Sequence, residues 1–292
     1  MAPPILVANG LTKDYGSFRA LDELTLTIAP GEVVGLLGPN GSGKTTALRL
    51  ALGFIRPTAG TVTIAGFDCW TDSVQTRQRV TYLPGELRLY ESMTGRQLVQ
   101  FLGKLRGETP GSEVDLLAKR LDIDPDKALT QMSSGMKRKV ALLVVLVPKV
   151  PLIILDEPTN TLDPTMRDEL IEQLKLAKAE GKAILFSSHV LQEAEAVCDR
   201  VAFLRKGKLV HVQNMSDLRG GRHVSARLTG SAPTLGPDGS PLPAIVGDRF
   251  HFDYRGPLPP LLTWLAVQPF DDLKIEPMGL TPIYKKFHGG DV

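Results

Sequence analysis

The chain has 292 residues, of which 42% are hydrophobic and 23% are charged, a length that suffices for one large or two modest domains. Its formal net charge of +2 gives no indication of a polyanionic partner, so no nucleic acid is expected. The two cysteines, Cys69 and Cys198, stand far apart, which disfavours a disulfide framework or a zinc site and favours a reducing cytoplasm. No run of about 18 apolar residues and no signal-peptide pattern is visible, so the sequence predicts a chain that does not cross a membrane by itself.

Strand and helix patterns alternate through most of the chain, which predicts an α/β layered domain. The predicted elements, in chain order, are strands over Ile5–Thr12, Leu24–Ile28 and Val33–Leu37, a helix over Thr45–Leu52, a short strand over Gly60–Phe67, a helix-rich segment over Gly85–Leu146, a strand over Leu152–Asp156, a helix over Leu170–Ala179, a strand over Ala183–Ser187 and a helix over Val190–Cys198. The all-apolar strand over Leu152–Asp156 is typical of a parallel sheet covered on both faces.

The character of the sequence changes after Leu218. The segment GSAPTLGPDGSPLP is dense in Gly, Pro and Ser, which indicates turns. DRFHFDY alternates as a strand, and PLPPLLTWLAVQ and TPIYKKFH are patterned as short helices. We therefore predict a first domain over 1–218, with a helical subdomain over about 85–147, and a small α+β accessory domain over 219–292.

A phosphate-binding motif follows the predicted strand over Val33–Leu37. The pattern G-x-x-x-x-G-K-[ST] is matched by Gly38, Pro39, Asn40, Gly41, Ser42, Gly43, Lys44 and Thr45. Glycines let backbone amides surround phosphates, and the start of the following helix adds positive potential. Lys44 is predicted to reach the β- and γ-phosphates of ATP, while the Thr45 hydroxyl is predicted to bind Mg²⁺.

An acidic pair ends a second buried strand, in the stretch LIILDEPTNTLDP. Asp156 lies at the predicted carboxyl edge of the sheet, where it would hold Mg²⁺ through water. Glu157 is placed to act as the general base for the attacking water. His189 ends the strand AILFSSH at the same edge, where it either has a structural role or donates a hydrogen bond to the γ-phosphate.

With these motifs in order, residues 5–218 resemble the nucleotide-binding subunit of an ATP-binding-cassette (ABC) transporter. The resemblance implies a P-loop NTPase core with a parallel-rich sheet, an antiparallel N-terminal β-subdomain and a helical subdomain. It identifies Tyr15 as the aromatic residue that stacks on adenine, Gly38–Thr45 as Walker A, and Leu152–Glu157 as Walker B with its catalytic glutamate. It also assigns the D-loop to Thr161-Leu162-Asp163 and the switch histidine to His189, while Thr46 completes the expected nucleotide-binding set.

The stretch MSSGMKRK is similar to the family signature, usually Leu-Ser-Gly-Gly-Gln. The resemblance implies that Ser133 and Gly135 contact the γ-phosphate bound to a second subunit, and Ser134 between them joins the expected nucleotide-binding set. We expect Lys137, Arg138 and Lys139 to face or surround that anionic nucleotide, with the alternative that some of them are only solvated. Ser134 and Met136 depart from the family pattern. A further departure is Gly85, which aligns with the glutamine of the family's Q-loop; the neighbouring Glu86 is a candidate substitute.

The region around Gly85 and the C-terminal segment resemble the branch that exports drugs, antibiotics or lipids. The resemblance implies an ATPase that works as a homodimer, or with a paralogous subunit, and that drives a separate integral-membrane permease docked near Gly85–Gly95. The chain would then lie on the cytoplasmic face of the cell membrane. Two alternatives stay open: a soluble ABC-type ATPase that acts on ribosomes or DNA, and an ATP sensor that does not hydrolyse the nucleotide.

Overall fold

A computed structural model describes residues 2–159, 162–218, 220–242 and 249–288. The chain divides into two compact units, the first comprising Met1–Gln213 and Phe287–Val292 and the second comprising Asn214–Lys286. This division falls near the predicted boundary after Leu218. The return of Phe287 to the first unit was not indicated by the sequence pattern, and the role of 219–292 as an accessory domain stays a prediction.

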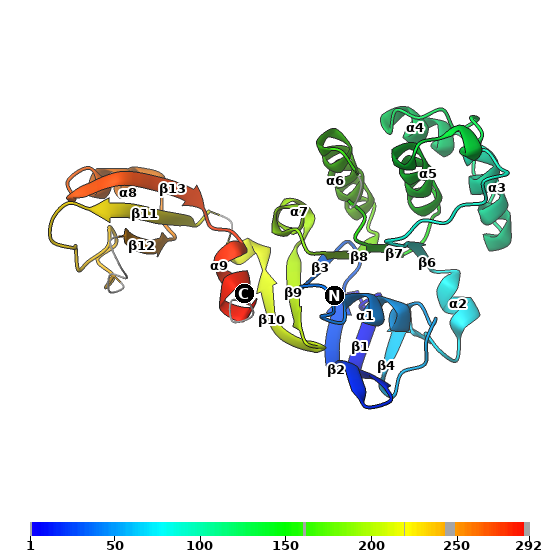
Figure 1. Ribbon diagram of the computed structural model, residues 1–292, viewed down its shortest axis with the longest axis horizontal. Coiled ribbons are helices and arrows are strands. Elements are labelled where there is room, and N and C mark those ends of the chain that lie inside the picture. Colours follow the sequence, from blue (N-terminus) through cyan, green and yellow to red (C-terminus); the bar gives the residue numbers. More distant parts are fainter. Residues whose placement is uncertain (1, 160–161, 219, 243–248, 289–292) are drawn as a thin grey trace. The chain divides into compact units, whose positions relative to one another are not determined.

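The first unit contains ten strands and seven α-helices among its described residues (Figure 1). Its strands are β1 (Leu6–Tyr15), β2 (Phe18–Ile28), β3 (Val33–Leu37), β4 (Ala59–Ile64), β5 (Phe67–Asp68), β6 (Val80–Leu83), β7 (Leu152–Asp156), β8 (Ala183–Ser188), β9 (Arg200–Arg205) and β10 (Lys208–Asn214). Its helices are α1 (Lys44–Ala51), α2 (Ser73–Arg77), α3 (Gly95–Arg106), α4 (Glu113–Arg120), α5 (Ser134–Leu146), α6 (Pro164–Ala179) and α7 (Leu191–Val197). The α/β class expected from the alternation of patterns is confirmed.

A six-stranded sheet in the order β10-β9-β3-β8-β7-β6 positions the candidate site. The pairs β9-β3, β3-β8, β8-β7 and β7-β6 are all parallel. Every residue of β3 and β7 is buried, as expected for central parallel strands. Because parallel strands end at one edge, the segments that follow β3, β7 and β8 come together, and the register pairs Asp156 with Ser187 and Leu37 with Ser188.

An antiparallel sheet in the order β2-β1-β4-β5 accompanies the parallel one. Buried side chains from both sheets and from α1 share one hydrophobic core, which includes Leu11, Leu21, Leu48 and Leu185. Burial of one such side chain stabilises the fold by roughly 1.5–3 kcal/mol. This core holds the loop between β3 and α1 rigidly against β1 and β2.

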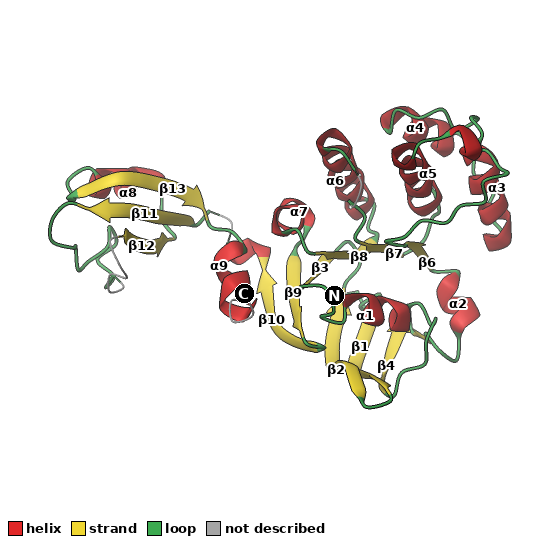
Figure 2. Ribbon diagram, viewed as in Figure 1, coloured by secondary structure: helices red, strands yellow, loops and turns green. Residues whose placement is uncertain are grey.

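Helices α3, α4 and α5 gather beyond β6 with no strand between them (Figure 2). Thr94 begins α3 with a capping box, in which its hydroxyl accepts a hydrogen bond from the Gln97 amide. The helix ends at Gly107, whose φ of 75° lies in the left-handed region typical of a glycine C-cap. Among the described residues, none of the helices combines the length and the apolar character that a membrane crossing requires.

The second unit is a small antiparallel sheet in the order β12-β11-β13 with an apolar core of its own. Its strands are β11 (Arg222–Leu228), β12 (Arg249–Tyr254) and β13 (Phe270–Pro277), and helix α8 (Leu258–Leu265) packs in the same core. Helix α9 (Thr281–His288) closes the described part of the chain. The predicted strand DRFHFDY corresponds to β12, apart from residue 248, which lies outside the described residues.

Candidate active site

The loop between β3 and α1 has a backbone that depends on glycine. Gly41 and Gly43 have φ angles of 78° and 105°. A Cβ on Gly43 would lie 2.7 Å from the Ala20 carbonyl oxygen, and one on Gly38 would lie 2.3 Å from the Leu204 carbonyl oxygen. Helix α1 begins at Lys44 with no side-chain cap and no acidic residue in its first turn. Its first amides are therefore available to an anion, as a phosphate-binding loop requires.

Two polar side chains of this loop point inward. Lys44 is only 5% exposed, and its ammonium donates hydrogen bonds to the carbonyl oxygens of Gly38 (2.8 Å) and Pro39 (3.3 Å). The Ser42 hydroxyl is buried and has no hydrogen-bond partner among the described residues. Buried polar groups are normally paired, so this hydroxyl and the glycine cradle fit a phosphate group as their missing partner.

The acidic edge of the sheet lies directly against this loop. The Thr45 hydroxyl is 3.3 Å from a carboxylate oxygen of Asp156, which is 5% exposed. Ser187, at the carboxyl end of β8, donates a hydrogen bond of 2.6 Å to the other Asp156 oxygen. Within the described ranges, no group of three or more His, Cys, Asp or Glu residues is arranged to hold a metal ion by itself. Thr45 and Asp156 are oxygen donors that suit Mg²⁺, which typically takes one or two protein ligands together with phosphate oxygens and water.

Glu157 occupies a constrained position beside Asp156. Its φ of 45° lies in the left-handed region, which is uncommon for a residue with a side chain. The Glu157 amide donates to the backbone oxygen and to the hydroxyl of Ser187, at 3.1 and 3.0 Å. Its carboxylate lies 3.6 Å from the Lys44 ammonium and 2.9 Å from Nδ1 of His189. The structure therefore brings the three predicted catalytic residues, Lys44, Glu157 and His189, into one cluster.

His189 was expected either to have a structural role or to contact the γ-phosphate. Its imidazole is 48% exposed and pairs with the Glu157 carboxylate. This arrangement fixes the direction of the carboxylate, and the contact with a γ-phosphate stays a prediction.

A cavity of about 250 Å³ opens from the phosphate loop toward β1 and β2. It is lined by Tyr15, Phe18, Ala20, Asn40, Gly41, Ser42, Gly43, Lys44, Thr45, Thr46 and Glu157. Tyr15 is 47% exposed and has the Lys13 ammonium 5.1 Å from its ring centroid. Phe18, which is 63% exposed, was not predicted from the sequence. Two exposed aromatic rings at the mouth suit a planar base.

The signature residues lie outside the lining of this cavity, as far as the described residues show. Ser133 caps α5, because its hydroxyl accepts a hydrogen bond of 3.2 Å from the Met136 amide. Asp163 caps α6 in the same way, through the Met166 amide at 2.9 Å. Within one chain the structure does not bring Ser133, Ser134, Gly135 or Asp163 to the phosphate loop. Thr161 of the predicted D-loop lies outside the described residues.

The structure contradicts the expectation for Arg138, which is neither solvated nor directed at a nucleotide, and gives Lys137 and Lys139 partners within their own chain. Lys137 forms a 2.5 Å ion pair with Glu91, and Lys139 donates to the Asp122 carbonyl at 3.1 Å. Arg138 is only 2% exposed and donates to four backbone carbonyl oxygens. All three cations are thus bound within their own chain, which the cation-rich pattern alone did not reveal.

Burial changes two pKa values beside the site. Burial raises the pKa of Tyr82 to about 12, and the Asp156 charge acts in the same direction. Burial lowers the pKa of Arg138, while the Asp156 charge opposes this shift. Both shifts arise chiefly because burial disfavours the charged form of each group, and the Asp156 charge adds to the shift of Tyr82 while opposing that of Arg138.

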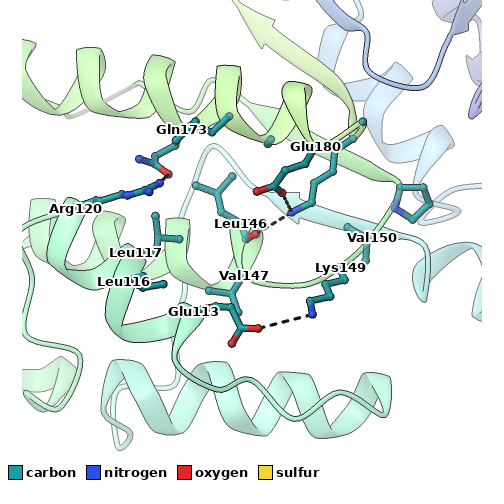
Figure 3. Close-up of a pocket in the computed structure, with 15 residues that line it drawn as sticks. Glu113, Leu116, Leu117, Arg120, Leu146, Val147, Lys149, Val150, Gln173 and Glu180 are labelled. Carbon is teal, nitrogen blue, oxygen red and sulfur yellow. Dashed lines mark hydrogen bonds and ion pairs between the residues drawn. The ribbon is translucent and has the colours of Figure 1, made fainter.

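A larger hollow of about 730 Å³ lies away from the phosphate loop, between α4, the end of α5 and α6 (Figure 3). Its charged side chains are largely paired with one another, as in Glu113 with Lys149 and Glu180 with Lys182. Arg120 reaches Gln173 at 3.5 Å across the hollow. The size of a hollow therefore does not identify the active site. The smaller cavity, beside which Lys44, the acids of β7 and His189 come together, is the candidate active site.

Comparison with known proteins gives a consistent result. A protein-family model described as ABC transporter matches residues 21–160. The chain is 36% identical over 199 residues to the ABC transporter ATP-binding protein NatA of Bacillus subtilis, a match that covers 66% of this chain and 81% of that protein. It is 32% identical over 224 residues to the daunorubicin resistance ATP-binding protein DrrA3 of Streptomyces coeruleorubidus, covering 75% and 71% of the two chains. A dimeric structure of MJ0796, a bacterial ABC transporter cassette, shares the fold with a TM-score of 0.66 at 24% identity, over 72% of this chain and 98% of that one.

Proposed function

Because this chain belongs to the ABC transporter family, whose ATP-binding subunits hydrolyse ATP to power transport, we propose that it drives the export of drugs, antibiotics or lipids through a separate membrane subunit. The observation that carries the proposal is the convergence of Lys44, Asp156 and Glu157 on one glycine-built phosphate loop. The printed name of DrrA3, a daunorubicin resistance protein, supports export over import.

In the proposed reaction each side chain has one task. Lys44 leaves the carbonyls of Gly38 and Pro39 to bind the β- and γ-phosphates, and the loop amides surround them. Thr45 and Asp156 would hold Mg²⁺, which would neutralise charge on the phosphates. Glu157 accepts the proton of the attacking water, and His189 keeps the carboxylate aimed at it.

The proposed unit of activity is a dimer, with two nucleotides at its interface. Ser133, Ser134 and Gly135 lie outside the cavity of their own chain, in the part that the structure describes, so a second copy would have to supply them. The dimeric state of MJ0796 supports this arrangement. ATP would favour the closed dimer and hydrolysis the open one, because the γ-phosphate contacts differ between the two states.

A groove on the helical side suits the membrane partner. It has a volume of about 460 Å³ and is lined mostly by apolar side chains from α2, β6, α3 and α5, together with two arginines, Arg77 and Arg106. Several large apolar residues around it are strongly exposed, among them Phe54 (51%), Val74 (65%) and Leu105 (68%). A neighbouring cavity reaches Pro84 and Tyr90, within or beside the predicted docking segment Gly85–Gly95. Such exposed apolar patches mark interaction sites, and a permease on the cytoplasmic face of the membrane is the partner we propose.

The test is steady-state ATP hydrolysis by the purified chain at several protein concentrations. We expect a specific rate that rises with concentration, since each site needs two copies. Glu157→Gln should bind ATP, lose at least 100-fold in rate and accumulate as a closed dimer, and Ser133→Arg should lose hydrolysis while the isolated chain still binds ATP. Glu172→Gln is the matched control, because its carboxylate is 61% exposed and pairs with Lys175 on the surface of α6, away from the phosphate loop.

Two outcomes would overturn parts of this proposal. A wild-type chain that binds ATP without hydrolysing it at any concentration would support the ATP sensor instead. A Glu157→Gln variant as active as the wild type would remove the base assignment. Copurification with ribosomes or DNA, in place of a membrane subunit, would favour the soluble ABC-type ATPase.

A further inference from the structure

Arg138 forms hydrogen bonds with two different loops, the turn at Pro84–Gly85 and the segment Glu157–Pro158. We propose that Arg138 is a positioning residue for ATP hydrolysis, which holds the backbone of Glu157 in place and ties to it the turn at Pro84–Gly85. The inference rests on the proposed role of Glu157 as general base. It assigns a task to a buried cation that the reaction described above does not use.

The guanidinium of Arg138 donates in two directions. On one side, Nη2 donates to the Glu157 carbonyl at 3.0 Å, and Nε donates to the Pro158 carbonyl at 3.1 Å. On the other side, Nη1 donates to the carbonyls of Pro84 and Gly85, at 3.0 and 3.2 Å. The two loops follow β6 and β7, which are adjacent parallel strands. A single planar group therefore bridges the ends of two strands from a third element, α5.

The burial of this charge argues for a specific task. Arg138 is 2% exposed and forms no direct ion pair with a carboxylate among the described residues, although the Asp156 charge favours its charged form. A buried charge without a direct ion pair is costly, and an apolar side chain would fill the space without that cost. What an apolar residue lacks is the rigid fork of five N–H donors, which matches several acceptors at once. The four carbonyl contacts are the benefit that offsets the burial.

Glu157 is a residue whose backbone needs to be held. Its left-handed φ of 45° is strained for a residue with a side chain and persists only where neighbouring groups enforce it. Ser187 holds the Glu157 amide, and Arg138 holds the carbonyl. Release of the carbonyl would let the peptide relax and move the carboxylate. A misplacement of about 1 Å reduces catalysis by roughly 100-fold.

At Gly85 the turn interacts with Arg138 through its backbone alone. Gly85 has no side chain to reach the reacting phosphate, and a Cβ built there would lie 3.5 Å from the Asp156 carbonyl oxygen, in ordinary contact. The turn is thus packed against the end of β7. Because Pro84 also lines the apolar cavity beside the predicted docking segment, Arg138 connects that surface to Glu157 through hydrogen bonds.

The experiment compares Arg138→Lys and Arg138→Gln with the wild-type chain. Lysine keeps the charge and glutamine keeps two donors, but neither reaches all four carbonyls. We expect kcat to fall about 100-fold for both, with ATP affinity of the isolated chain within twofold of wild type, since Arg138 does not line the nucleotide cavity. Lys139→Met is the matched control: it removes the neighbouring cation and one carbonyl contact, at Asp122, and should keep wild-type kcat.

A double-mutant cycle separates positioning from general stability. If Arg138 acts through Glu157, then Arg138→Lys should lower the residual rate by less than twofold when Glu157 is already Gln. Hydrogen exchange should increase together in peptides covering 82–88 and 155–159 of Arg138→Lys, but not of Lys139→Met. Hydrogen exchange reports directly on the hydrogen bonds between Arg138 and the two loops, and it can be measured for any variant that folds.

Three results would overturn the inference: unchanged kcat in both Arg138 variants, an equally large loss in the Glu157→Gln background, or unchanged exchange in the two peptides. Each differs from a failure of the proposed function, in which the wild type would be inactive or Glu157→Gln would be as active as wild type.

Discussion

Ser187 connects Asp156, the proposed metal ligand, to Glu157, the proposed base, and Ser187→Ala tests that connection. The Ser187 hydroxyl donates to the Asp156 carboxylate at 2.6 Å and accepts from the Glu157 amide at 3.0 Å, in a side chain with no exposed surface. Loss of a hydrogen bond to a charged group costs about 1.5–3 kcal/mol. The Glu157 amide retains the Ser187 backbone oxygen at 3.1 Å, so its loss adds only about 0.5 kcal/mol. We expect the free energy of unfolding to fall by about 2–3.5 kcal/mol.

Ser188→Ala provides the matched control. Ser188 is 1% exposed, donates to the Glu193 carboxylate at 2.9 Å and accepts from the Val190 amide at 2.9 Å. It therefore has the same kinds of contact, directed at α7 instead of the phosphate loop. Urea unfolding should show similar losses for the two variants.

Activity should distinguish the two serines. Groups that orient a metal ligand typically contribute about 10–100-fold to metal affinity or activity. We expect Ser187→Ala to raise the Mg²⁺ concentration needed for half-maximal hydrolysis by that factor, and Ser188→Ala to leave it unchanged. An unchanged Mg²⁺ requirement in Ser187→Ala, together with a destabilised fold, would refute the reasoning and leave Ser187 a structural residue.

Three further predictions concern the nucleotide cavity and its surroundings. Tyr15→Ala should weaken ATP binding by about 10-fold, because it removes base stacking of about 1–3 kcal/mol per base. Tyr15→Phe keeps the ring and should bind ATP normally. A titration with a fluorescent nucleotide measures both variants, and equal affinities would contradict the stacking role. Lys44→Met should reduce ATP affinity at least 10-fold in the same titration, because it removes a buried ammonium aimed at the phosphates; retained affinity would exclude a phosphate contact. Burial raises the pKa values of Cys69 and Tyr82 to about 12, so the unfolded chain ionises these groups first. Their contribution to stability should thus be complete below about pH 8.5 and be lost as the pH rises from about 9 toward 12. Urea midpoints at pH 8 and pH 10.5 check this, and a constant midpoint would disprove it.

The parts of the site that are encoded locally could be predicted from the sequence. The loop Gly38–Thr45 and the acids at Asp156 and Glu157 each follow an apolar strand, so their motif and their position at the sheet edge are visible within a dozen residues. The predicted helix over Leu170–Ala179 was too short, since α6 begins at Pro164 after the cap at Asp163. The Asp-Pro signal for that start was present in the sequence.

The parts that depend on distant contacts could not be predicted in this way. Ser187 meets Asp156 across 31 residues, and Arg138 meets Pro84 across 54. Both contacts require the strand order and register of the six-stranded sheet, which the sequence pattern does not specify. Arg138 also lies among neighbouring lysines, so its type and position gave no indication that it alone would be buried.

The left-handed backbone at Glu157 has a consequence for how this protein responds to selection. Glycine adopts that conformation without penalty, so Glu157→Gly should make the chain more resistant to heat while abolishing hydrolysis. A directed-evolution screen that rewards thermostability alone would then discard the residue that we propose as the general base. Engineering a more thermostable variant of this ATPase therefore requires a selection that also measures activity, or stabilising substitutions placed away from the end of β7.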